Sequence, residues 1–161
     1  MKKLLLYSIC ALAVCGGLFA ANGYSHNNSA PNFECVGCHQ GDMAADLVKV
    51  DGLPKKYVPG KTYKLTITVN STMKSEGDVA GGFAAEASGG TLVVVDKKNT
   101  QLSDGLLTHT QEGSVLRKWT IGWKAPSRKE EVTLSIMAMA ANGDFSPNGD
   151  VVGAEIVTLK P

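Results

Sequence analysis

The sequence predicts an all-β protein in which two antiparallel sheets pack face to face as a β-sandwich. Three observations predict this fold class. Short segments alternate apolar and polar residues, clusters of Gly, Asn, Asp and Pro separate them, and almost no segment has helical periodicity. The chain has 161 residues, a length that suits one domain once a leader has been removed.

The clearest strand is predicted directly after the turn signal at Pro59 and Gly60. Apolar residues at every second position from Tyr63 to Val69 alternate there with lysine and threonine, as expected for a strand with one buried face. Further strands are predicted over 91–95, 115–123, 132–136 and 151–159. The only helix that the pattern favours is a short one over 43–46.

The first residues have the pattern of a secretory signal peptide. Lys2 and Lys3 give a basic start, residues 4–14 are apolar, and alanines follow at 20 and 21. The apolar run is too short to span a bilayer well, so we expect no integral membrane span after cleavage. The sequence therefore predicts export, to the periplasm or the extracellular space.

Three segments follow from these patterns. Residues 1–21 are predicted to be the signal peptide, residues 22–50 an exposed polar arm with a cysteine motif, and residues 51–161 the β-sandwich. Cys15 ends a degraded lipobox in which Val14 replaces a small residue, so lipidation at Cys15 is the alternative to simple cleavage.

The charge of the chain is close to balanced. Loss of Lys2 and Lys3 with the signal leaves about 14 basic residues against 15 acidic ones. No run of basic residues and no interleaving of basic with aromatic residues is present, so the sequence gives no indication of nucleic-acid binding.

The cysteines outside the signal indicate a prosthetic group. Cys35 and Cys38 are followed at once by His39, the C-x-x-C-H signature of covalent haem c attachment. Two thiols at this spacing can form thioethers with both haem vinyl groups, and the adjacent imidazole is a suitable axial ligand. A zinc site, a thioredoxin-like redox motif and a plain disulfide are the alternatives. They are disfavoured by the number of ligands, by the fold class and by the very small loop, respectively.

The opposite axial position of the iron has several candidates. His109 lies far enough along the chain to approach the haem from the other side, and histidine and methionine are the usual sixth ligands. The weaker alternatives are Met73, Met137, Met139 and His26. A histidine on a surface loop remains the plain alternative for His109.

With these residues in place, the sequence resembles the bacterial reelin-like domain proteins of the choice-of-anchor V type. The resemblance is carried by the C-x-x-C-H motif before residues 57–63, by residues 108–110 before 119–126, and by the loop over 140–150. It implies an immunoglobulin-like, reelin-like sandwich with an N-terminal haem-binding extension, and it favours His109 as the histidine that faces the haem.

The loop over 142–150 carries oxygen-bearing side chains at alternate positions, which is reminiscent of a calcium loop. The closing glutamate of an EF-hand is missing, however. A hairpin loop whose Asn and Asp side chains stabilise turns is therefore favoured over a calcium site.

Together these observations predict an exported monohaem c-type cytochrome. A haem with two protein ligands transfers one electron and leaves no open position for a substrate, so we expect an electron carrier and not an enzyme. The expected partners are redox proteins, including other cytochromes or further copies of the chain. The alternatives are a binding or adhesion module with a structural haem, and a haem-based sensor or peroxidase-like enzyme.

Overall fold

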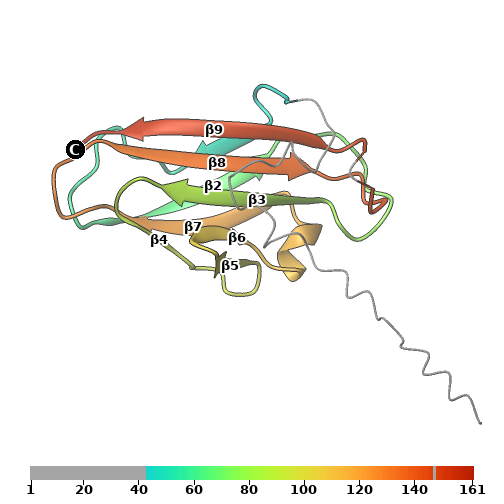
Figure 1. Cartoon of the computed structure of the whole chain (residues 1–161), viewed down its shortest axis with the longest axis horizontal. Coiled ribbons are helices and arrows are strands. Elements are labelled where there is room, and N and C mark those ends of the chain that lie inside the picture. Colours follow the sequence, from blue (N-terminus) through green and yellow to red (C-terminus); the bar gives the residue numbers. More distant parts are fainter. Residues whose placement is uncertain (1–42, 147) are drawn as a thin grey trace, which may run out of the picture.

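The alternating segments of the sequence become the strands of two antiparallel sheets in the computed structural model, which describes residues 43–146 and 148–161. One sheet has four strands in the order β1–β2–β7–β4, and the other has five in the order β5–β6–β3–β8–β9. The two sheets face each other and overlap in the view of Figure 1. The predicted antiparallel β-sandwich is confirmed.

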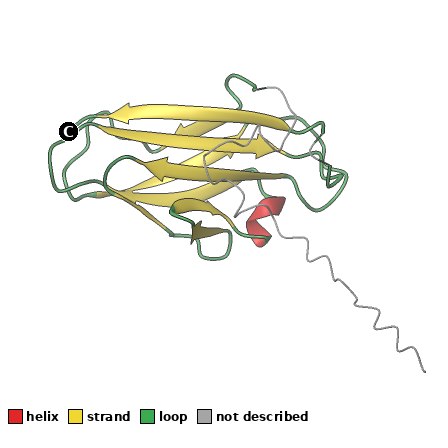
Figure 2. Cartoon of the chain, in the orientation of Figure 1, coloured by secondary structure: helices red, strands yellow, loops and turns green. Residues whose placement is uncertain are grey.

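The strands are short and nearly all of the described chain is strand or loop (Figure 2). The 3-10 helix η2 (Glu112–Val115) lies between β6 and β7. The strands are β1 (Val48–Asp51), β2 (Thr62–Val69), β3 (Gly81–Ala87), β4 (Thr91–Val93), β5 (Thr100–Ser103), β6 (Leu106–His109), β7 (Lys118–Lys124), β8 (Val132–Ala140) and β9 (Val151–Leu159). In the part of the chain that the structure describes, no helix is long and apolar enough to cross a bilayer.

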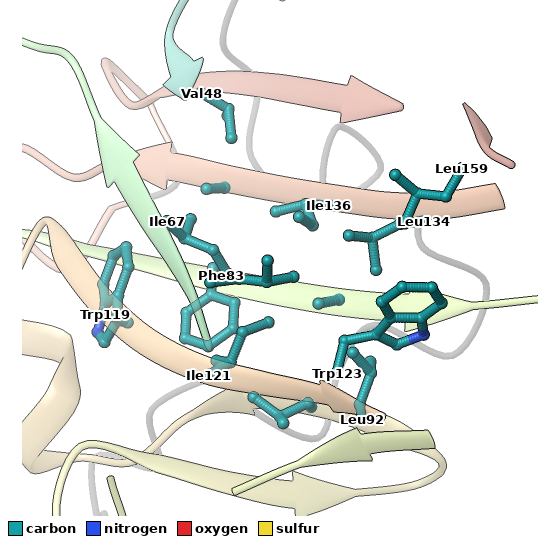
Figure 3. Close-up of a cluster of buried hydrophobic side chains, with 14 of the residues drawn as sticks. Val48, Ile67, Phe83, Leu92, Trp119, Ile121, Trp123, Leu134, Ile136 and Leu159 are labelled. Carbon is teal, nitrogen blue, oxygen red and sulfur yellow. The ribbon is translucent and has the colours of Figure 1, made fainter. Parts of the chain in front are cut away.

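The core fills the space between the two sheets, as Figure 3 shows. Alternation places Leu65 and Ile67 of β2 inside, where register pairs them with Ile121 and Trp119 of β7. Trp119 and Trp123, at 1% and 0% exposure, are the largest side chains of this core. Burial of such aromatic and aliphatic surface is the main force that holds the two sheets together.

The structure corrects the expected helix over 43–46. Met43 instead forms a parallel bridge with Val152 at the free edge of β9, and the Ala44 amide donates to the Val152 carbonyl at 2.8 Å. Asp46 has φ of 61°, which a right-handed helix does not contain. The apolar–polar pattern is too short here to nucleate a helix, and pairing with a sheet edge satisfies the backbone instead.

Further expectations differ in their boundaries. The strand expected over 91–95 is β4, which ends at Val93, and the strand expected over 132–136 is β8, which continues to Ala140. The strand expected over 115–123 begins at Lys118, because Val115 belongs to η2 and is half exposed. Strand β1 begins at Val48, three residues before the expected start of the sandwich at 51, and its residues pair with β2 from Val69 backwards.

Candidate functional site

The haem-attachment residues lie outside the described part of the chain. Cys35, Cys38, His39 and His26 all precede residue 43, as does the signal peptide over 1–21. Their roles stay predictions. The described chain does contain the other half of the expected site, namely His109 and the methionines.

His109 ends strand β6 and sits where two aromatic side chains of the core reach the edge of the sandwich. Its ring centroid is 6.3 Å from that of Phe83 and 6.4 Å from that of Trp119. Its backbone pairs with Thr100 of β5. In addition, the side-chain amide of Gln101 donates to the His109 carbonyl at 2.9 Å. The side chain is half buried, so it is not the freely solvated loop histidine of the plain alternative.

The Nδ1 atom of His109 is held by the backbone of Phe83. It lies 3.2 Å from the Phe83 amide nitrogen and 3.2 Å from the Phe83 carbonyl oxygen. The first contact suits an imidazole that accepts at Nδ1, and the second suits one that donates from Nδ1. Each neutral tautomer therefore has a backbone partner without any movement of the ring.

Thr108 completes this anchor. Its buried hydroxyl donates to the Phe83 carbonyl at 2.6 Å and also lies 3.2 Å from Nδ1 of His109. The ladder between β3 and β6 thus continues through side chains beyond its last backbone pair, Ala84 with Thr108. Among the described residues no group hydrogen-bonds Nε2, so the second ring nitrogen is left available.

The imidazole lies directly against Gly82 of β3. A Cβ atom at position 82 would stand 2.6 Å from Cε1 of His109 and 3.0 Å from Nε2. Such distances are far inside van der Waals contact, so only glycine leaves room for the ring in this position. Sequence reasoning missed Gly82, although the pair of glycines at 81 and 82 within an apolar run was a signal for close approach.

Burial keeps the imidazole neutral. Desolvation lowers the pKa of His109 from its ordinary value of 6.5, and the hydrogen bond with the Phe83 backbone opposes this effect only in part. At neutral pH the side chain is therefore uncharged and has a ring nitrogen lone pair, as a metal-binding histidine requires.

The methionine candidates fall into two groups. Met137 and Met139 lie on strand β8 on the face that points away from the core, and register places Met139 beside Gly82. Met73 instead packs against the core, and its carbonyl accepts from Arg117 at 2.6 Å. The structure thus brings His109, Met137 and Met139 to one region of one sheet, whereas Met73 packs against the core.

The loop after β8 uses its side-chain oxygens within the loop. Oxygens of Asn142, Asp144 and Ser146 each accept from the backbone amide two residues further on, at 3.2, 2.7 and 3.2 Å. Asp150 accepts from the Asn142 amide at 3.1 Å. These are the turn-stabilising contacts expected of a hairpin loop. Within residues 43–146 and 148–161, no three His, Cys, Asp or Glu side chains gather as a metal site would require.

No family model and no curated protein matches the sequence. Solved structures do resemble the fold. The Reelin-N domain of F-spondin matches with a TM-score of 0.53 and 16% identity, over 78% of this chain and 94% of that domain. A human F-spondin reeler domain matches with a TM-score of 0.51 and 15% identity, over 75% and 96% of the two chains.

The fold is reelin-like. A further fragment of the human F-spondin reeler domain matches at a TM-score of 0.50, with 17% identity over 74% of this chain. These identities are low, so the likeness concerns the reelin-like sandwich alone. The chemistry has to be argued from this chain's own residues.

Proposed function

We propose that this protein is an exported monohaem c-type cytochrome that transfers single electrons. Cys35 and Cys38 hold the haem covalently, His39 is the proximal iron ligand and His109 of the reelin-like sandwich is the distal one. With both axial positions taken by protein, the haem supplies a one-electron couple and no open site for a substrate. Its partners are other redox proteins outside the cytoplasm.

The observation that carries this proposal is the state of His109. Its Nδ1 is fixed by Phe83 while Nε2 has no partner among the described residues, and burial keeps the ring neutral. A metal-bound histidine ordinarily donates its other ring N–H to a backbone carbonyl or carboxylate, which fixes the tautomer and the ring orientation. The Phe83 carbonyl supplies that partner, so the residues present fit an axial ligand to haem iron.

Under this proposal, three residues of the sandwich that contact His109 have defined roles. Phe83 and Thr108 set the ring's orientation before the haem arrives, and Gly82 gives the ring its space. A ligand fixed in both redox states lowers the rearrangement that accompanies electron transfer. No residue of the site has to move a proton or bind a substrate for this function.

Spectroscopy of the purified, exported full chain tests the proposal. Haem that resists acid extraction and stays on the peptide with Cys35 and Cys38 would support covalent attachment. Low-temperature EPR and near-infrared MCD of the ferric protein should show a low-spin haem with two nitrogen ligands. The variant His109→Ala should convert this signal to high spin.

Met139→Leu is the matched control for His109→Ala, because Met139 lies two strands away on the same sheet and could itself bind iron. It should leave the two-nitrogen signal intact. An unchanged signal in His109→Ala would remove His109 as the ligand. A wild-type signal of one nitrogen and one sulfur ligand that Met139→Leu converts to high spin would assign that role to Met139. A five-coordinate wild-type haem that binds CO or cyanide readily would overturn the electron-carrier proposal.

A further inference from the structure

The outer face of the five-stranded sheet carries an apolar patch beside His109. Register places alternate residues of β3, β8 and β9 on this face, opposite to the core. At the end of the sheet where β9 begins, these residues are small or soft. We call them the outer patch: Gly82, Ala84, Met137, Met139, Val152 and Ala154.

The outer patch is largely buried although it does not belong to the core. Ala84, Met137 and Val152 are only 5%, 8% and 0% exposed, and none of them is part of the core cluster. The first five residues of β3 are all buried, whereas a strand with one solvated face would alternate. At this end the sheet therefore has the character of a strand layer covered on both sides.

The same outer face changes character further along the strands. On β3, Glu86 follows two residues after Ala84; it is exposed and pairs with Ser135 of β8. On β9, Ile156 follows two residues after Ala154 and is 69% exposed. The apolar and buried part is thus confined to the end near His109.

Sheet register joins the outer patch to His109 on one side and to the haem-bearing segment on the other. Met43 bridges to Val152, Val152 pairs with Met139, Met139 pairs with Gly82, and Gly82 touches the His109 ring. Three strand spacings of about 4.8 Å separate Met43 from Gly82, roughly 14 Å in all.

The chain between the haem motif and the sheet has a matching reach. His39 stands four residues before Met43, and four extended residues span at most about 14 Å. His39 can therefore stand over the outer patch as far as Gly82, next to His109.

We propose that the outer patch is the haem seat, against which the haem on the segment 35–42 packs when His39 and His109 bind its iron. The inference rests on the proposed function and adds the surface that shields the macrocycle. Its occupant is the flat, apolar tetrapyrrole. The small residues Gly82, Ala84 and Ala154 leave space for the macrocycle, and the flexible side chains of the two methionines can pack against it.

Methyl NMR of the full holoprotein tests the seat directly. Ferric low-spin haem is paramagnetic and the ferrous form is diamagnetic, so nuclei close to the iron change their shifts on reduction. With ¹³C-methyl methionine, the Met137 and Met139 signals should shift far more than the Met73 signal, which is the internal control because Met73 packs against the core. A larger shift at Met73, or equal shifts at all three, would overturn the seat.

A pair of substitutions on β9 gives an independent readout. Ala154→Arg places a charge in the outer patch, whereas Ile156→Arg places it two residues on, on the same face but outside the patch. Ala154→Arg should reduce the Soret circular dichroism and shift the haem potential, and Ile156→Arg should leave both near wild type. Equal effects of the two variants would contradict the seat.

The two proposals fail in different ways. Absence of covalent haem, or an iron with one protein ligand, would overturn the proposed function. A covalent six-coordinate haem with unshifted Met137 and Met139 signals would leave the cytochrome standing and overturn the seat alone.

Discussion

Single atoms decide whether His109 can reach its position. Replacement of Gly82 by alanine places a Cβ 2.6 Å from Cε1 of the ring, so the imidazole must move. We expect Gly82→Ala to keep covalent haem but lose a large part of the low-spin signal, and to cost about 1–3 kcal/mol of stability through overpacking. Absorbance, EPR and urea unfolding measure the two effects.

Gly122→Ala is the control for Gly82→Ala. Position 122 is also in a strand, on the other sheet, and its added Cβ would stand 3.1 Å from Val93 Cβ and from Val95 Cγ1, a looser contact than the 2.6 Å at position 82. We expect it to leave the haem spectrum unchanged. A low-spin signal that survives in Gly82→Ala would show that His109 does not need its present position.

Thr108 is expected to stabilise the site through one buried hydroxyl. Thr108→Val keeps the shape of the side chain but removes the donor to the Phe83 carbonyl, at 2.6 Å. We expect a loss of about 1–3 kcal/mol of unfolding free energy, since a buried carbonyl loses a partner. Thr66→Val, on the outer face of the four-stranded sheet, should cost clearly less in the same urea titration.

The depressed pKa of His109 predicts how stability responds to acid in haem-free protein. The unfolded chain binds a proton at the ordinary pKa of 6.5, and the folded chain binds it only at a lower pH because the ring is desolvated. Stability should therefore be unaffected by His109 above pH 6.5 and should fall as the pH drops from 6.5 through the lower folded pKa.

Urea midpoints of the double variant Cys35→Ser with Cys38→Ser, which cannot attach haem, measure this dependence. The same background with His109→Gln is the comparison, because glutamine does not titrate. A parallel pH profile for both proteins below pH 6.5 would show that His109 is not desolvated in the folded chain.

At the scale of elements, Arg117 connects the segment that precedes β3 to the end of β8 through hydrogen bonds. Its guanidinium donates to the carbonyls of Met73 at 2.6 Å, Ala80 at 2.9 Å and Ser71 at 3.2 Å, and also to that of Ala141 at 3.3 Å. It thus joins the segment before β3 to the end of β8. These contacts account for a charged residue at a position where the alternation of Trp119, Ile121 and Trp123 would place an apolar one.

We expect Arg117→Leu to cost about 3 kcal/mol, because four partly buried carbonyls lose a charged donor at once. Hydrogen exchange should increase first in residues 70–80 and at the start of β3. Arg128→Leu, at an exposed position, is the control and should change little. Exchange that rises evenly across both sheets would contradict a local role.

The sequence predicted β2, β4, β7, β8 and β9, and it missed β3 and the four-residue strands β1, β5 and β6. Strand β2 alternates because Leu65 and Ile67 face the core while Lys64 faces water, and β9 was placed with its observed bounds. Strand β3 gave no such signal, because its outer face is covered as well and Gly and Ala occupy both faces. The missing alternation in β3 is thus a physical consequence of the outer patch.

For the candidate site, the sequence could identify His109 but not the residues that hold it. His109 could be selected from the sequence because few histidines are available and the reelin-like resemblance points to it. Its anchor could not, because Gly82, Phe83 and Thr108 meet it only through the pairing of β3 with β6, which is a tertiary contact. Residue types alone do not specify such register.

At the scale of the whole molecule, the described residues form an extensive core of their own. Within residues 43–146 and 148–161, the members of the core cluster run from Leu47 to Leu159, and β1 to β9 make up the two sheets. We therefore expect a protein consisting of residues 43–161 to fold alone, with strand-type circular dichroism and cooperative urea unfolding. Removal of the extension should then leave the outer patch open to solvent.

An apolar surface that is opened in this way should bind a hydrophobic dye. We expect residues 43–161 to bind anilinonaphthalene sulfonate more strongly than the haem-loaded full chain, and to associate at high concentration, because contiguous apolar surface is rarely left exposed on a monomer. Ala84→Lys, which places a charge in the outer patch, should reduce dye binding, and Thr66→Lys on the other sheet should not. A folded 43–161 that binds no more dye than the full chain would show that the extension and its haem do not cover this face.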